Sequence, residues 1–223
     1  MGRSAESLHT RGVYIPAHFK PDDATVVELL DHQGAADLVT VTAGGLLATM
    51  LPFLYDPPGS RPDAGPLGSL VGHVARNNQQ WREPSLGDSL VIVRGPDAYI
   101  SPAWYATKRE HGRVVPTWNY LTAHVYGPLV IHDDLAWLEA LVRRLTAHHE
   151  ANRERPWSVD DAPPEYVAGQ LRAIVGVEVR IARIEAKAKL SQNRSDADIA
   201  GVIAGLDGSG QLALAGVMRK LGR

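Results

Sequence analysis

The sequence predicts a small β-barrel of mostly antiparallel strands, with helices at its ends and after the sheet. Short β-rich runs alternate with tight Gly or Pro turns between residues 37 and 131, which is typical of such barrels. Apolar residues then recur at helical spacing over 133–151. A strictly alternating run over 174–184 returns to the period of a strand. These periods together favour a mainly β fold with helical additions.

Turn residues mark the ends of the expected strands. Gly44-Gly45 is a hairpin signal, Pro52 indicates an edge or bulge position, and Gly95-Pro96 is interpreted as a turn. The run over 56–66 is expected to be an exposed loop, and residues 108–112 a solvated turn. The expected strands span 37–42, 46–55, 67–75, 88–94, 98–105, 114–126, 129–131 and 174–184.

Aspartate and proline mark the starts of the expected helices, because both are favoured in the first turn of a helix. Asp22 or Asp23 can cap the first helix, and Asp133 or Asp134 the second. The expected helices span 23–30, 133–151, 164–172 and 196–221, the last as one or two helices, with a helical turn over 77–81.

The composition is that of a globular protein and excludes several classes of site. We expect one domain over 13–223 behind a disordered leader over 1–12, in a chain that is 44% hydrophobic and 22% charged. The net charge of −2 argues against a nucleic-acid partner. The lack of cysteine excludes disulfides, thiolate nucleophiles and Cys-ligated metals. With no membrane-spanning run and no signal peptide, a cytoplasmic location is expected.

The densest aromatic segment covers residues 97–127, in a chain that is only 6% aromatic. Trp118 and Tyr120 in this segment could stack on a flat cofactor. They could equally be core side chains, because an aromatic ring buries much apolar surface. The residue pattern leaves both interpretations open.

His73, in the run GHVARNN, is a candidate ligand. Imidazole commonly binds haem iron where no thiolate is present. Arg76 could hold a phosphate or a propionate, with Asn77 next to it. The alternative is a strand-end histidine that hydrogen-bonds a neighbouring backbone group.

A polar cluster follows the last expected strand and contains Lys187, Lys189 and Ser191 in the run KAKLSQN. A lysine there can contact a phosphate, or act as a base if burial lowers its pKa. The alternative is an ordinary polar loop. Thr49 adds a hydroxyl within a β-rich run, where threonine is common. The chain has no GxSxG, HExxH, Walker or GxGxxG motif, so hydrolase triads and nicotinamide Rossmann sites have no support.

Several motifs in order resemble the PaiB-like family, also called the FMN-binding negative transcriptional regulator family. They are YIPAHF, GHVARNN, GPDAYISPAWY, EHGRVVPTWNY, HVYG, IVGVEV and KLSQNR, and they cover about residues 13–203. The resemblance implies an FMN-binding split barrel of the pyridoxamine-phosphate-oxidase type, with peripheral and C-terminal helices. It also implies a homodimer with cofactor sites at the subunit interface.

The resemblance extends to piperazate synthases, haem-dependent enzymes that close N5-hydroxyornithine into a cyclic hydrazine with loss of water. Their haem is held by a histidine at the position of His73. This chain departs from the usual NPQW at residues 78–81 and from the usual GKWKLSQN at 186–193, where Ala188 replaces a tryptophan. Both departures are expected to flank the pocket.

The leading hypothesis is therefore a homodimeric haem b enzyme of the piperazate synthase type, with a hydroxylated ornithine as substrate. His73 would bind the iron and Arg76 a propionate, while Lys187 or Lys189 would bind the substrate carboxylate or move a proton. The remaining cofactor-binding residues would be Thr49, Asn77, Trp118, Tyr120 and Ser191. The alternative is a PaiB-like transcriptional regulator that binds FMN and has no enzymatic activity. Fold membership alone does not choose between them.

Overall fold

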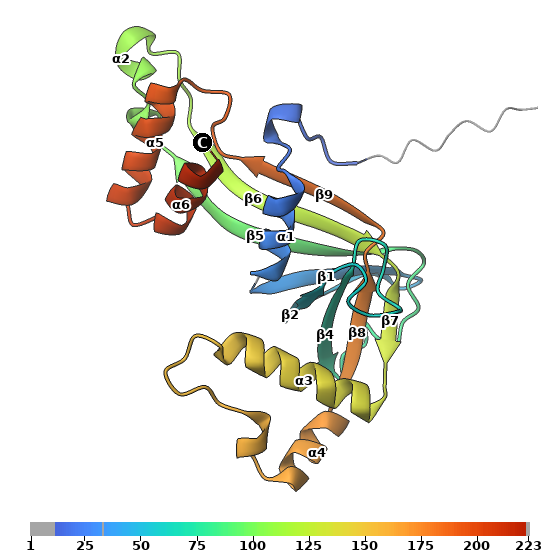
Figure 1. Ribbon diagram of the computed structural model, residues 1–223. Coiled ribbons are helices and arrows are strands. Elements are labelled where there is room, and N and C mark those ends of the chain that lie inside the picture. Colours follow the sequence, from blue (N-terminus) through green and yellow to red (C-terminus); the bar gives the residue numbers. More distant parts are fainter. Residues whose placement is uncertain (1–11, 33, 222–223) are drawn as a thin grey trace, which may run out of the picture.

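The computed structural model describes residues 12–32 and 34–221, and the expected leader over 1–12 lies outside them except for Gly12. In these residues two antiparallel sheets face each other across the main hydrophobic core (Figure 1). This is the expected split barrel. The strands are β1 (Ala35–Thr42), β2 (Gly45–Pro52), β3 (Leu54–Asp56), β4 (Ser69–Ala75), β5 (Ser89–Ile100), β6 (Thr117–Gly127), β7 (Leu129–His132), β8 (Ile174–Arg180) and β9 (Arg183–Lys189).

One sheet has five strands, in the order β2-β1-β5-β6-β9, and the other has four, in the order β3-β4-β8-β7. Inward-facing residues alternate along each strand, so the core takes every second side chain. The helices are α1 (Asp23–Asp31), α2 (Thr107–His111), α3 (Leu135–Glu150), α4 (Pro164–Arg172), α5 (Asp196–Gly208) and α6 (Leu212–Leu221), with 3-10 turns at Ala17–Phe19, Pro102–Trp104 and Val159–Asp161.

The capping predictions are confirmed. Asp22 accepts a hydrogen bond from the Thr25 amide, and Asp134 accepts one from the Trp137 amide, each at 2.8 Å. Pro164 is the first residue of α4, and the C-terminal segment forms two helices. Local signals therefore set the starts of the main helices correctly.

Two predicted strands are in fact interrupted where the chain passes from one sheet to the other. The run over 174–184 breaks between β8 and β9, and the run over 46–55 breaks between β2 and β3. Ile181 at the first corner is fully buried. Alternation therefore continues through the corner, and period alone does not reveal the change of sheet.

Several other local predictions are wrong. Gly95-Pro96 is not a turn, because β5 runs through it with a bulge between Arg94 and Asp97. The strand expected over 98–105 ends at Ile100, the solvated turn over 108–112 forms most of α2, and residues 77–81 form turns without a helix. Asp56, expected in an exposed loop, is only 3% exposed.

The outer faces of the two sheets differ. Helix α3 packs against the four-stranded sheet, where Leu141 and Leu145 contact Leu54 and Val71. The five-stranded sheet keeps exposed apolar side chains on its outer face. They are Val41, Leu46, Met50, Tyr99 and Trp118, which are 46–72% exposed. No helix in the described part of the chain is both long and apolar enough to cross a membrane.

Candidate functional site

Four of the predicted site residues share the outer face of the five-stranded sheet. The aromatic side chains of Trp118 and Tyr120 come from β6, and Lys187 and Lys189 come from β9. Tyr120 lies opposite Lys189 in the β6–β9 register, and alternation puts all four on one face. We call this surface the aromatic–lysine face.

A groove of about 330 Å³ runs along this face. Trp118 is 54% exposed, and its ring meets the Tyr99 ring edge to face at 6.4 Å between centroids. Trp118 is therefore not a core residue, whereas Tyr105 of the same aromatic segment is 2% exposed and belongs to the main core. The groove is lined by Ile92, Arg94, Gly95, Asp97, Trp118, Tyr120, Leu121, Thr122 and His124.

Lys189 is held in place by two hydrogen bonds. Its ammonium donates to the Thr117 hydroxyl and to the Trp118 carbonyl, both at 2.5 Å. Burial lowers its pKa, and the neighbouring charges of Lys187 and Arg194 lower it further. The ammonium thus fixes the backbone under Trp118, while its lowered pKa is the property that a proton-transfer lysine needs.

Lys187 is less constrained. Its ammonium donates to the Tyr14 carbonyl at 3.3 Å and lies 5.9 Å from the centre of the Tyr120 ring. A half-buried ammonium beside an aromatic ring can contact both a flat cofactor and its phosphate.

Ser191 and Thr49 have structural partners inside the barrel. Ser191 is 4% exposed, adopts φ of 67°, and accepts a hydrogen bond from the Asn119 amide at 3.0 Å. Thr49 lies on β2 and accepts a hydrogen bond from the Asn78 side chain at 2.9 Å. Neither hydroxyl projects from the aromatic–lysine face, and each bonds to the side-chain amide of an asparagine.

His73 lies on the other sheet. It is paired with Gly176 across β4 and β8, and the Trp137 ring of α3 lies so close to Gly176 that a Cβ there would be 2.2 Å from it. The His73 Nδ1 atom is buried and has no hydrogen-bond partner. Burial lowers the pKa of His73, so the imidazole stays neutral near pH 7. The neutral form is the one that binds metals.

This burial predicts a pH-dependent stability. The native pKa of His73 lies below its ordinary 6.5, so the unfolded chain takes up the proton first as pH falls. The free energy of unfolding should decrease from about pH 7 to about pH 5, and His73→Gln should make that decrease smaller. Urea unfolding across this range measures it, with the exposed His149→Gln as control. Equal slopes for wild type and His73→Gln would contradict the prediction.

Arg76 is occupied by protein partners. Its guanidinium forms an ion pair with Asp133 and donates to the carbonyls of Arg172, at 2.7 Å, and Ile174, at 3.0 Å. These contacts join the end of β4 to the starts of α3 and β8. Asn77 is exposed in the turn after β4. Arg76 would have to exchange partners to hold a propionate or a phosphate.

The structure therefore brings together Trp118, Tyr120, Lys187 and Lys189. It places His73 on the other sheet, with Arg76 and Asn77 in the turn that follows β4. Sequence reasoning missed Arg94, which joins the groove from β5. The alternation of β5 before the bulge, which puts Ile92 and Arg94 on one face, is the signal that could have found it.

The two departures from the family motifs lie away from the groove. Ala188 is 1% exposed and packs in the main core, on the face opposite Lys187 and Lys189. Gln80 is 3% exposed and donates to the Leu38 carbonyl and the Thr40 hydroxyl. The departure at Ala188 therefore affects packing in the core. The departure at Gln80 affects the contact that the turn after β4 makes with β1.

The fold is that of a split-barrel protein of the flavin-binding type. A family model described as "Putative FMN-binding domain" matches residues 13–183. The chain is 35% identical over 195 residues to "Protease synthase and sporulation protein PAI 2" of Bacillus subtilis (strain 168), covering 86% of this chain and 87% of that protein. The chain belongs to this FMN-binding family, the PaiB-like family that its motifs indicate.

Solved structures support the fold. The flavocytochrome Anf3 from Azotobacter vinelandii aligns with a TM-score of 0.52 at 16% identity, covering 80% of this chain and 73% of that one. The conserved hypothetical protein Rv2991 from Mycobacterium tuberculosis aligns with a TM-score of 0.55 at 11% identity, covering 82% and 94%. At these identities the likeness concerns the fold alone.

Proposed function

We propose that this chain is an FMN-binding regulatory protein that holds the flavin on the aromatic–lysine face. The observation that carries the proposal is an exposed Trp118 beside Tyr120 in the groove, with the ammonium of Lys187 5.9 Å from the centre of the Tyr120 ring. A flat ring system stacks on such aromatic side chains. FMN would supply redox-active flavin chemistry when bound.

Lys187, Lys189 and Arg94 would have different roles in flavin binding. Lys187 has one carbonyl partner at 3.3 Å and is free to exchange it for a phosphate oxygen. Lys189 holds the Trp118 carbonyl and keeps the stacking residue in position. Arg94 is paired with Asp37 at 2.5 Å and contributes a guanidinium to the rim of the groove.

A second copy of the chain would complete the site. The groove, at about 330 Å³, lies at the small end of the range of about 300–1,000 Å³ for ligand pockets. Antiparallel sheets usually carry polar residues on an uncovered face, whereas this face exposes Leu46 and Met50. Both features support a homodimer in which the cofactor lies between the five-stranded sheets of the two copies.

The regulatory role rests on the family relationship. The Bacillus subtilis relative is named for protease synthesis and sporulation, which are controlled processes. A cytoplasmic location agrees with such a role. Retention of one DNA sequence over others at moderate salt would support direct transcriptional control, because nonspecific binding fades with salt.

A haem-dependent cyclase of the piperazate synthase type is the second candidate, acting on a hydroxylated ornithine. The buried, unpartnered Nδ1 atom of His73 and its lowered pKa favour it, because a neutral imidazole is a metal ligand. Haem would supply a Lewis-acidic iron at His73. The pairing of Arg76 with Asp133 counts against the expected propionate contact. Lys189, with its lowered pKa, would be the residue to move a proton.

The absorption spectrum of the purified protein tests both candidates. We expect the two visible bands of a flavin, and a weakening of flavin binding by about tenfold in Trp118→Ala, because stacking is lost. Trp157→Ala is the matched control, since Trp157 is 49% exposed and lies outside the groove. A Soret band that disappears in His73→Ala, without flavin bands, would overturn the proposal in favour of the haem enzyme.

A further inference from the structure

Residues 12–19 run beside β9, the edge strand of the five-stranded sheet, before the chain enters α1 (Figure 1). Two successive backbone groups hold them there. The Val13 amide donates to Glu185 at 3.1 Å, and the Tyr14 carbonyl accepts from Lys187 at 3.3 Å. Glu185 and Lys187 are two residues apart on β9, so alternation puts both on one face. We call residues 12–19 the β9 strap.

The two ends of the strap are held differently. At the far end Phe19 is 8% exposed and closes a 3-10 turn, in which its amide donates to the Pro16 carbonyl at 2.8 Å. At the near end the Tyr14 side chain is 81% exposed. Burial therefore fixes the far end, whereas hydrogen bonds from β9 side chains hold the near end.

Glu185 keeps its position independently of the strap. Its side chain is 15% exposed, pairs with Arg183 and also accepts a hydrogen bond from the Tyr126 hydroxyl at 3.4 Å. Arg183 and Tyr126 both belong to the sheet, on β9 and β6. The state of the near end therefore depends on the second contact, which Lys187 makes.

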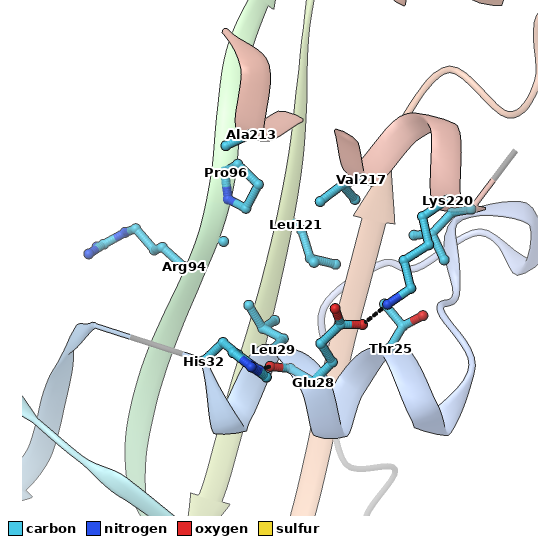
Figure 2. A pocket seen from close by; sticks show the side chains of 12 residues that line it. Thr25, Glu28, Leu29, His32, Arg94, Pro96, Leu121, Ala213, Val217 and Lys220 are labelled. Carbon is cyan, nitrogen blue, oxygen red and sulfur yellow. Dashed lines mark hydrogen bonds and ion pairs between the residues drawn. The ribbon is translucent and has the colours of Figure 1, made fainter. Parts of the chain in front are cut away.

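The charge of Lys187 is not balanced by a carboxylate. Among the residues that the structure describes, no acidic side chain pairs with Lys187, and the Tyr14 carbonyl is its hydrogen-bond acceptor. Lys220, at a separate groove between α1 and α6, differs in this respect, because the dashed line in Figure 2 marks its ion pair with Glu28. Lys187 is thus available to an anion, which is a stronger partner than a neutral carbonyl.

Lys187 lies between the strap and the groove of the aromatic–lysine face. Its ammonium is 6.0 Å from the centre of the Phe19 ring and 5.9 Å from the centre of the Tyr120 ring. Tyr120 lines the groove, whereas Lys187 does not. A phosphate on a ligand in the groove would therefore draw the ammonium toward Tyr120 and away from the strap. A charge-assisted bond of this kind is roughly twice as strong as a bond to a neutral carbonyl.

We propose that the β9 strap is released when FMN occupies the groove, because the flavin phosphate takes Lys187 from the Tyr14 carbonyl. The inference rests on the proposed function and adds to it the segment that changes state on binding. A regulatory protein needs such a difference between its free and bound forms. Phe19 stays buried, so the strap turns about its far end and frees the backbone at Val13 and Tyr14.

Hydrogen–deuterium exchange of the full-length protein measures this release, with the Val13 amide as the probe and flavin fluorescence as the record of binding. FMN should speed the exchange at Val13 by about tenfold, because the near end then loses one of its two contacts with β9. Riboflavin has the same ring system without the phosphate, so it should bind and leave the exchange unchanged. Release by riboflavin to the same extent would overturn the role of the phosphate.

The two levels of the proposal fail in different ways. FMN binding without faster exchange at Val13 would overturn the strap alone and leave the proposed function standing. Absence of FMN binding would overturn the proposed function and, with it, the coupling.

Lys187→Met tests the contact without any ligand. The variant should exchange at Val13 as fast as the wild-type protein with FMN, and adding FMN should cause no further change. Lys108→Met is the matched control, since Lys108 is an exposed lysine on α2 and its variant should behave as wild type. Unchanged exchange at Val13 in a folded, ligand-free Lys187→Met protein, checked by circular dichroism, would refute the strap whether or not flavin binds.

Discussion

Replacing Met50 with aspartate is expected to separate the proposed homodimer into folded monomers. Met50 is 70% exposed on β2, and Leu46 on the same strand is 72% exposed. A buried, unpaired carboxylate at an interface carries a large desolvation penalty, whereas in a monomer the same side chain stays in water. Light scattering after size exclusion should show the mass halved for Met50→Asp, and for Leu46→Asp as well.

Tyr166→Asp is the matched control. Tyr166 is 61% exposed on α4 and lies outside the five-stranded sheet, so its variant should remain dimeric. If the cofactor lies between the two copies, Met50→Asp should retain less flavin as well as less dimer. A wild-type protein that is monomeric at all concentrations would reject the interface, and a dimeric Met50→Asp protein would place it on another face.

Replacing Glu178 with alanine should destabilise the fold by about 3–5 kcal/mol, because it removes a buried carboxylate on which Arg61 and His132 depend for a hydrogen bond. Glu178 is fully buried between the four-stranded sheet and α3. It accepts a hydrogen bond from Arg61 at 2.5 Å, and its other oxygen lies 2.8 Å from His132 Nε2. Arg61 also pairs with the buried Asp56 at 3.0 Å. The loop over 56–66 is thereby held on the sheet.

Urea unfolding measures this effect, and Glu139→Ala is the control. Glu139 pairs with Arg143 one turn away on α3, and both side chains are more than 40% exposed. Its loss should cost less than about 1 kcal/mol, because exposed pairs are weak. Similar losses for Glu178→Ala and Glu139→Ala would show that the Glu178 network does not stabilise the sheet–helix layer.

Local sequence signals predicted the elements that depend on neighbouring residues. The cap at Asp22, the proline start of α4 and the Gly44-Gly45 hairpin are examples, since each depends on backbone groups within about four residues. Local sequence signals failed where strand pairing with distant segments decides whether a strand continues, bulges or changes sheet. The Gly95-Pro96 signal was interpreted as a turn although β5 continues through it with a bulge, and the corner at Ile181 has no local breaker to show it.

By itself, the sequence determined the split barrel, the PaiB-like family and the residues that share a face. The strand period places Trp118 with Tyr120 on one face of their strand wherever that strand goes. Lys187 and Lys189 were expected after the last strand, and the structure places them on β9 instead. Only the tertiary structure decided that this face is open to solvent and that His73 lies on the other sheet beneath α3. The two-residue period of a strand shows which side chains lie on the same face. Whether that face is buried or exposed depends on segments far away in the chain.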